Sequence, residues 1–204
     1  SDFSTRDPEN NRTIIEKAGE KQVVLVENAS GFTLGGIDVR NVSDTSGIAD
    51  NIALYIRGSS GSVNDSWIYE STYDRGIALA ITDSSDVTVD NAYVAVISEL
   101  SAGYSTANVD SNSYGIFLGW VDSEYGDSGN DESNLTVTNS TIRGHTVESP
   151  SLYEHVAIYI LSSGDVTVGE NTLRPGISGE VANGSPTGLF LTGCLADSQK
   201  VLRF

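Results

Sequence analysis

The amino-acid sequence predicts an all-β protein folded as a right-handed, single-stranded parallel β-helix, a solenoid of about five full coils and one partial coil. Three observations predict this fold. A phrase of three short apolar runs recurs along the chain, its internal spacing is nearly constant, and no segment keeps an apolar period of 3.6 for long enough to form a substantial helix. One phrase alone cannot bury its apolar side, whereas stacked copies share a core.

The recurring phrase is clearest in the copy that begins at Gly76. Alternating apolar residues occupy positions 77, 79 and 81, a polar turn follows, and the later runs supply Val87, Val89 and Val94. The other copies have apolar residues at Val24, Val26, Phe32, Leu34 and Val39; at Ile52, Leu54, Ile56, Val63 and Ile68; at Ile116, Leu118, Trp120, Leu135, Val137 and Ile142; and at Val156, Ile158, Ile160, Val166, Val168 and Leu173. A partial copy begins at Leu189 and Leu191. Period-two alternation rich in β-branched residues is typical of strands.

The spacing of the phrase distinguishes strands from loops. In four copies the same five-residue step joins the second run to the third, at 63–68, 89–94, 137–142 and 168–173. The distance between copies varies, and we therefore predict loop insertions at residues 97–114, 121–134, 144–155 and 174–187. Stacked strands must stay in register, whereas loops that leave the stack need not. We assign residues 22–204 to the β-helix and residues 1–21 to an N-terminal lead-in or cap, with one helical turn allowed in residues 13–20.

An antiparallel β-sandwich would also show short alternating strands, but it does not explain a three-strand phrase of constant internal spacing. The phrase resembles the right-handed parallel β-helices of the pectin-lyase-like superfamily, most clearly in Gly76-Ile-Ala-Leu-Ala-Ile and Leu135-Thr-Val-Thr-Asn-Ser-Thr-Ile. The resemblance spans about residues 22–204 and implies the fold. It leaves the function open, because this fold is shared by lyases, hydrolases, epimerases, phage tailspikes, adhesins and passive stalks.

The composition describes one acidic domain. The 204 residues carry a formal net charge of −17 and include only three lysines. This charge argues against nucleic acid and anionic membranes as partners, and no apolar run is long enough for membrane insertion. Dense carboxylates with few lysines are expected of a marine or halophilic protein, although a charge that only maintains solubility explains them as well. A single cysteine, Cys194, excludes an intrachain disulfide.

Seven Asn-x-Ser/Thr sequons favour an exported protein located outside the cell, on the cell surface or on a virion. The candidate glycosylation sites are Asn11, Asn28, Asn41, Asn64, Asn134 and Asn183. The seventh sequon, at Asn139, falls on the recurring turn position and is not a candidate. A turn composition rich in Ser, Thr and Asn is an alternative explanation. Because the chain stops on an apolar strand, we expect further chain or another subunit beyond it.

The first strand of each copy presents an unusually apolar outward row. Its aromatic members are Tyr55, Phe117, Tyr159 and Phe190. A contiguous apolar row on a surface indicates a partner, a ligand such as a glycan, or a covering loop. We therefore predict self-association, another surface subunit or a polysaccharide as the partner of this row.

Two other recurring positions are interpreted structurally. The outward row of the second strand is hydroxyl-rich and typical of a solvated face; it contains Thr33, Ser62, Thr88, Thr136 and Thr167. The turn before the third strand carries Asp65, Asn91, Asn139 and then Glu170 or Asn171. Short polar side chains in such turns form hydrogen bonds with the backbone, and we expect a ladder from coil to coil.

Catalysis on a polysaccharide would need a base and a group that neutralises an acidic sugar. The candidate residues are Arg143, His145, Glu154 and Tyr159, which we expect to converge in one groove if the protein is an enzyme. The chain has no adjacent aspartate pair, and the sequence signatures of polygalacturonases and pectate lyases are absent. These absences favour a protein without catalytic activity, and both histidines are then residues of solvated loops.

An acidic loop supplies the candidate metal ligands Asp122, Glu124, Asp127 and Asp131. Ca²⁺ prefers six to eight oxygen ligands, and carboxylates close together in a loop can supply them. The spacing is not that of an EF-hand, and a solvated acidic loop without any cofactor is the alternative.

We therefore predict a non-enzymatic, extracellular or surface-exposed β-helix domain that acts in self-assembly, adhesion or glycan contact through the outward row of the first strands. The alternative is a polysaccharide lyase, epimerase or hydrolase module with a site between the first strands and the long loops. A third hypothesis, from fold resemblance, is a periplasmic or surface carbohydrate-binding β-helix.

Overall fold

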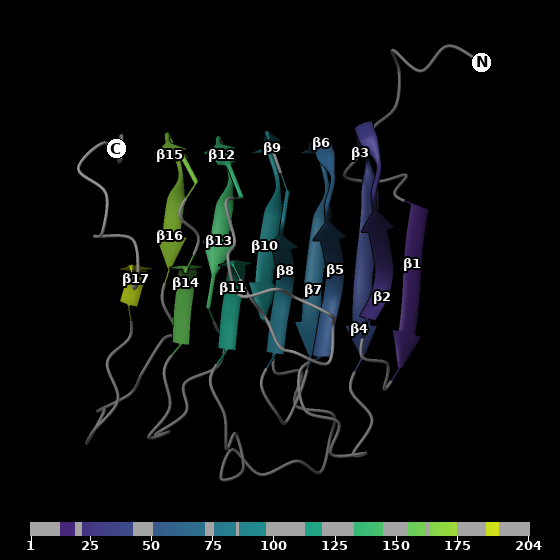
Figure 1. The fold of residues 1–204 in the computed structure, drawn as a ribbon. Helices are drawn as coiled ribbons and strands as arrows, with labels where there is room; N and C mark the ends of the chain where they lie inside the picture. The colour runs from purple at the N-terminus through teal and green to yellow at the C-terminus, as the bar shows by residue number, and fades with distance from the viewer. Residues whose placement is uncertain are drawn as a thin grey trace, which may run out of the picture.

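The structure is a computed structural model, and it describes residues 13–18, 22–42, 51–71, 76–84, 86–96, 113–119, 133–144, 155–161, 164–174 and 187–191. All secondary structure in these residues is β-strand. The strands form three sheets, which run side by side through the molecule (Figure 1). The expected insertions at 97–114, 121–134, 144–155 and 174–187 fall for the most part outside the described residues.

Each sheet takes every third strand of the chain. Sheet A contains β1 (Thr13–Ala18), β4 (Ile37–Val42), β7 (Trp67–Ser71), β10 (Tyr93–Val96), β13 (Thr141–Arg143) and β16 (Thr172–Arg174). Sheet B contains β2 (Gln22–Glu27), β5 (Asn51–Arg57), β8 (Gly76–Thr82), β11 (Ser113–Leu118), β14 (His155–Ile160) and β17 (Thr187–Leu191). Sheet C contains β3 (Ser30–Gly35), β6 (Ser60–Asn64), β9 (Val87–Asp90), β12 (Leu135–Thr138) and β15 (Val166–Gly169).

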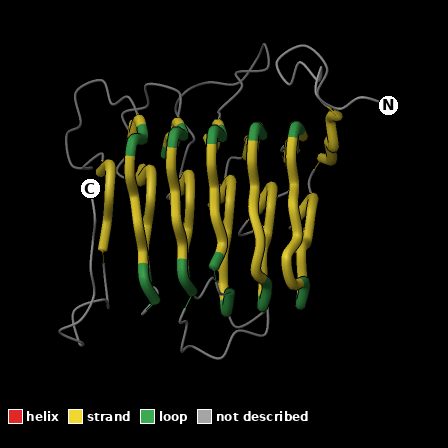
Figure 2. The backbone as a smooth tube through the Cα atoms, turned by 90° about the horizontal axis from the view of Figure 1, so that it is seen from above, coloured by secondary structure: helices red, strands yellow, loops and turns green. Residues whose placement is uncertain are grey.

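Every strand pair among the described residues is parallel, and each strand pairs with the strand three places along the chain. One coil is thus a trio such as β5, β6 and β7, and successive trios stack in sequence order, from the purple strands to the yellow strand of Figure 1. Viewed from above, the described turns line up at both ends of the strands (Figure 2). The predicted all-β parallel solenoid is therefore confirmed.

The core is built from columns of equivalent residues. One column of sheet B contains Val24, Leu54, Leu79, Ile116 and Ile158, and the column of sheet A contains Val39, Ile68, Val94, Ile142 and Leu173. These residues belong to one continuous apolar cluster inside the coils. Burial of this cluster, at about 25 cal/mol per Å² of apolar surface, is the main stabilising contribution to the stack.

The alternation predicted for sheet B is wrong at its first positions. The repeat places Ile52 with Leu54 on the core side, but Ala53 and Leu54 both pack in the core, whereas Ile52 packs with Tyr55 in a second cluster. The hydrogen-bonded ladder omits Ala53, which marks a distortion where the alternation changes phase. The strand therefore presents Ile52 and Tyr55 on the same side, three positions apart.

The equivalent position in β11 is Gly115, which the ladder also omits. A Cβ at this glycine would lie 2.7 Å from the carbonyl oxygen of Ala157 and 2.8 Å from that of Arg143. Sheets A and B therefore approach too closely here for any side chain. The one helical turn allowed in residues 13–20 is also wrong, because Thr13–Ala18 forms β1 and pairs with β4.

The turns between sheets C and A place one residue of each coil in the left-handed region, with φ between 49° and 65°. These residues are Gly36, Asp65, Asn91, Asn139 and Glu170. Glycine, asparagine and aspartate adopt this conformation at the lowest cost, which explains the recurring residue types. The N–H groups of Gly36, Asp65 and Asn91 donate to carbonyl oxygens of the next coil, each at 3.2 Å.

The predicted turn ladder is confirmed with one change of partner. The Asn91 side chain donates to Asp65 at 2.6 Å, but the Asn139 side chain donates to Asp90, at 2.8 Å. The Thr138 hydroxyl donates to the same Asp90 oxygen at 2.7 Å. These two hydrogen bonds, the Thr138 bond first, lower the pKa of Asp90 below its ordinary value.

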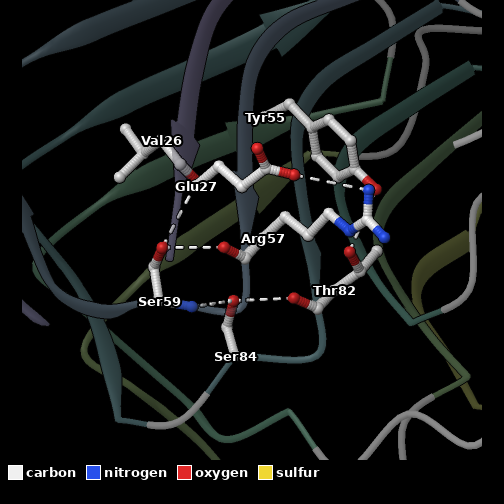
Figure 3. A network of polar contacts seen from close by, with 7 residues as sticks. All are labelled: Val26, Glu27, Tyr55, Arg57, Ser59, Thr82 and Ser84. Carbon is white, nitrogen blue, oxygen red and sulfur yellow. Dashed lines mark hydrogen bonds and ion pairs between the residues drawn. The ribbon is translucent and has the colours of Figure 1, made fainter. Parts of the chain in front are cut away.

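The corner between sheets B and C contains a ladder of buried serines, Ser59, Ser84 and Ser133. Figure 3 shows Ser59 and Ser84. The Ser59 N–H donates to the Ser84 hydroxyl at 3.2 Å, and the Ser84 N–H donates to the Ser133 hydroxyl at 2.9 Å. The Ser84 hydroxyl donates to the carbonyl oxygen of Thr82 at 2.7 Å. The ladder satisfies backbone groups that the turns would otherwise leave unpaired, and it links successive coils.

Candidate functional site

Among the side chains that the structure describes, the outer side of sheet A carries three aromatic residues and two arginines that lie together. We call Arg40, Trp67, Tyr69, Tyr93 and Arg143 the sheet A face. They come from four adjacent strands, β4, β7, β10 and β13, and alternate with core residues such as Ile68 and Val94. Trp67 is 38% exposed, and the other four are half-buried. The face is therefore accessible, because the alternation of side chains along each strand directs these residues outward and their apolar neighbours inward.

The three rings form one contiguous platform. The Trp67 ring centroid lies 5.6 Å from those of Tyr69 and Tyr93, and the two tyrosine centroids lie 5.7 Å apart. Trp67 meets Tyr69 edge-on and Tyr93 at a tilt. Register explains the grouping: Trp67 is paired with Tyr93 on the next strand, and Tyr69 follows two positions after Trp67 on the same side. Because the rings contact one another, they hold each other in place.

Arg40 is held by an acidic partner at one end of the platform. Its Nε and Nη2 donate to the two carboxylate oxygens of Asp38, at 2.9 and 2.6 Å. A carboxylate oxygen of Glu16 lies 3.8 Å from the Arg40 Nη1. Asp38 is 2% exposed. The hydrogen bonds with Asp38 raise the pKa of Arg40 above its ordinary value. With its charge compensated, Arg40 lies 5.8 Å from the centre of the Tyr69 ring, where it acts as a brace.

Arg143 lies at the other end of the platform in a different electrostatic setting. Its guanidinium carbon lies 5.7 Å from the centre of the Tyr93 ring. Among the described residues Arg143 makes no ion pair, and its buried Nε has no hydrogen-bond partner. The small residue Ala95 is its register neighbour on β10. Three strand steps separate Arg143 from Arg40, a distance of about 14 Å at the usual strand spacing.

This arrangement suits a ligand that has both flat apolar faces and polar groups. Exposed indole and phenol rings offer stacking surfaces, and the tyrosine hydroxyls and Arg143 offer hydrogen bonds. A binding surface commonly combines aromatic area with a few placed polar groups. A sugar chain has these properties, because each ring has an apolar face and a rim of hydroxyls.

The sequence reasoning did not identify the sheet A face. In each copy the third run shows a single inward apolar residue, such as Ile68 or Val94, and the outward residues beside it follow no repeated apolar pattern. The signal that could have found the face is the alternation Trp67-Ile68-Tyr69, with Tyr93 at the equivalent position one coil later.

The predicted partner face, the outer side of sheet B, is not a free surface. We call the second apolar cluster the sheet B face; its buried members are Ile52, Tyr55, Ile77, Ala80, Tyr114, Phe117 and Val156. Tyr55 is 1% exposed and Phe117 is 4% exposed. Tyr55 and Phe117 lie outside the core cluster, as expected of an outward row, but they are buried within the single chain, which fits the covering alternative better than a free partner surface. Tyr159 is half-buried, and the side chain of Phe190 lies outside the described part of the chain.

The sheet B face is organised like a core. Phe117 stacks on Tyr159 with ring centroids 5.0 Å apart, and Tyr114 contacts both rings. The Tyr55 hydroxyl lies 3.0 Å from the Thr82 hydroxyl, so its polar end is satisfied in a buried position (Figure 3). Next to it, Arg57 donates to Glu27 at 3.4 Å.

The four candidate catalytic residues are only partly described. Arg143 packs on Tyr93 at the sheet A face, and Tyr159 packs on Phe117 at the sheet B face, so these two contact different aromatic clusters. His145 and Glu154 lie outside the described residues. The convergence of all four in one groove therefore stays a prediction.

The candidate Ca²⁺ ligands Asp122, Glu124, Asp127 and Asp131 all lie outside the described residues. Within the described ranges no group of three or more His, Cys, Asp or Glu residues is arranged to hold a metal ion. The described part of the chain likewise contains no helix that could cross a membrane.

The sequons occupy different environments. Asn28 is exposed in the turn before β3, and Asn64 and Asn134 are half-buried. Asn41 is 1% exposed, and a glycan needs an accessible amide and room around it, so the structure argues against this candidate. Asn11 and Asn183 lie outside the described residues. The occupancy of the other sequons stays a prediction.

Comparison with known proteins gives no match: no family model, no curated protein and no solved structure is significantly similar to this chain.

Proposed function

We propose that the protein is a glycan-binding β-helix domain without catalytic activity, located outside the cell, on the cell surface or on a virion. The observation that carries the proposal is the contiguous platform of Trp67, Tyr69 and Tyr93 on an accessible sheet face. The proposal keeps the predicted class of function but moves the contact from the sheet B face to the sheet A face. Membership of the pectin-lyase-like superfamily is part of the proposal; the three parallel sheets support it.

The shape of the face favours an extended ligand. The five residues lie on four adjacent strands along the axis of the stack, over about 14 Å at the usual strand spacing. A glycan chain lying along this axis would meet Trp67 and Tyr93 on successive coils. The sheet itself holds these strands in register, so little ordering of the protein is needed on binding.

A glycan array with purified protein tests the proposal, followed by titration calorimetry with the glycans that bind. The variant Trp67→Ala is expected to weaken binding at least about tenfold, equivalent to about 1.4 kcal/mol. Leu25→Ala is the matched control, since Leu25 is also an exposed large apolar residue but lies on sheet B. Unchanged affinity in Trp67→Ala, or an equal loss in Leu25→Ala, would contradict the proposal.

Self-association is a second candidate function, favoured by the N-terminal end of the stack. Ile14 and Ile15 of β1 and Leu25 of β2 are exposed large apolar residues. Within the described residues β1 and β2 are the terminal strands of their sheets, and such edges can pair with another chain. Sedimentation velocity over a wide concentration range tests this candidate; Ile14→Lys should abolish any dimer that the wild type forms, and a strictly monomeric wild type would exclude it.

A further inference from the structure

We propose that Arg143 gives the sheet A face a preference for glycans that carry an acidic group, a carboxylate or a sulfate ester, next to the stacked sugar. This inference rests on the proposed glycan binding and specifies its ligand. It assigns Arg143 a role in ligand recognition, and it assigns Arg40 a structural role.

The two arginines of the face differ in whether an acidic side chain of the protein pairs with them. Arg40 has a bidentate partner in the buried Asp38, with contacts of 2.6 and 2.9 Å. Arg143 has no ion-pair partner within the described residues, and its interaction with the protein is with the Tyr93 ring. A guanidinium presents a planar fork of N–H donors that matches an anionic oxygen pair. Of the two, Arg143 is therefore the arginine that gains more from an acidic ligand.

The hydrogen-bond requirement of Arg143 points the same way. Its buried Nε has no hydrogen-bond partner within the described part of the chain, which leaves a donor unsatisfied there. An unsatisfied buried donor is costly, whereas a hydrogen bond to a charged acceptor is among the stronger ones. An anionic group at the edge of the Tyr93 ring would supply acceptors to the guanidinium while the attached sugar stacks on the platform.

The charge of the rest of the chain makes this local preference distinctive. The protein carries a net charge of −17, which repels polyanions at long range. At physiological ionic strength this repulsion is largely screened beyond about 8 Å, whereas a direct pair with Arg143 is screened much less. A glycan with a few acidic groups therefore fits the face better than a densely charged polymer.

The test compares matched acidic and neutral oligosaccharides at physiological ionic strength. Oligosaccharides of hyaluronan and alginate are titrated beside their carboxyl-reduced counterparts, and oligosaccharides of a sulfated galactan, whose only acidic groups are sulfate esters, beside desulfated ones. The wild type is expected to bind at least one acidic form about tenfold more tightly than its neutral counterpart. The carboxylate and sulfate pairs show which acidic group is recognised.

Three variants assign the preference. Arg143→Gln should remove it while changing affinity for the neutral counterparts less than about twofold, because the rings remain. Arg143→Lys, which keeps the charge without the fork, should retain part of it. Arg40→Gln should keep the preference, because Arg40 is already paired with Asp38. A preference that survives Arg143→Gln, or equal losses for acidic and neutral forms, would overturn the inference.

Failure of this inference can be told apart from failure of the proposed function. If Trp67→Ala abolishes binding but acidic and neutral forms bind equally to the wild type, glycan binding stands and the inference is wrong. If Trp67→Ala leaves binding of every oligosaccharide unchanged, or if nothing on the array or among these oligosaccharides binds, the proposed function fails and the inference fails with it.

Discussion

Sheets A and B both present an aromatic outer side, but the two sides differ in accessibility and in polar content. The sheet B face packs Phe117 and Tyr114 among aliphatic residues and buries them almost completely. The sheet A face leaves Trp67 exposed and places an arginine at each end of the platform. The difference teaches that aromatic residues in an outward row do not themselves identify a binding surface.

The polar contacts explain how each face is stabilised. On the sheet B face, the Tyr55 hydroxyl lies 3.0 Å from the Thr82 hydroxyl, so a buried polar group is satisfied internally. On the sheet A face, the Arg40 charge is compensated by Asp38, but Arg143 has no ion-pair partner in the described part of the chain. The sheet B face resembles a second core, and the sheet A face resembles a surface that is open to a ligand.

The largest expected effect on stability is at the sheet B face. Phe117→Ala should lower the free energy of unfolding by about 3–5 kcal/mol, because it removes a buried ring and leaves a cavity beside Tyr159. Trp67→Ala is the control and should cost about 1 kcal/mol or less, since the indole is exposed. Urea unfolding of both variants measures the difference. Equal costs would mean that the two faces do not differ as described.

A smaller effect is expected at the brace of the sheet A face. Arg40→Ala leaves the buried Asp38 carboxylate without its bidentate partner and should cost about 1–3 kcal/mol. The double variant Asp38→Asn/Arg40→Ala, which also removes the charge left behind, should recover part of this loss. Thermal unfolding of the two variants distinguishes them, and a double variant no more stable than Arg40→Ala would show that the carboxylate is not the cause.

The Tyr55 hydroxyl gives a finer comparison between the faces. Tyr55→Phe should cost about 1 kcal/mol, because it leaves the buried Thr82 hydroxyl without this partner. Tyr93→Phe on the sheet A face should change stability by less than about 0.5 kcal/mol, since the tyrosine is half-buried and lies at a surface. Chemical unfolding of both variants is the measurement, and a reversed order would contradict the assignment of core and surface.

The smallest expected effect comes from the turn ladder and does not involve either face. Hydrogen bonds lower the pKa of Asp90 in the folded protein, so its contribution to stability is present above the unfolded value of about 3.9 and is lost as pH falls through the folded value. Asp90→Asn should therefore reduce the loss of stability below about pH 4. Unfolding midpoints measured across this range test it; an unchanged slope would show that Asp90 does not contribute.

The sequence predicted the coils well because the strands repeat a local pattern. The apolar alternation of Leu79 and Ile81 corresponds to core positions of β8, and the outward hydroxyl row of sheet C is in register across its strands, as Thr88 with Thr136 shows. Both features depend on the two-residue periodicity of a strand, which is visible directly in the sequence.

The faces were less predictable because their properties depend on contacts between distant residues. The change of phase at Ala53 comes from a distortion in the ladder, which simple alternation does not show. Burial of Tyr55 and Phe117 depends on what packs around them, and the grouping of Trp67 with Tyr93 depends on register between coils. The third run of each copy has only one repeated apolar position, so the repeat itself does not show that the neighbouring aromatic residues come together.

Acrylamide quenching of Trp67 fluorescence tests the difference between the faces most directly. The chain has two tryptophans, so the variant Trp120→Phe isolates the Trp67 signal. We predict that Trp67 is readily quenched in the free protein and that a glycan identified on the array protects it, while Trp120→Phe/Phe117→Leu, altered on the sheet B face, binds the glycan with the same protection. Quenching that stays unchanged at saturating glycan would contradict the assignment of the binding site to the sheet A face.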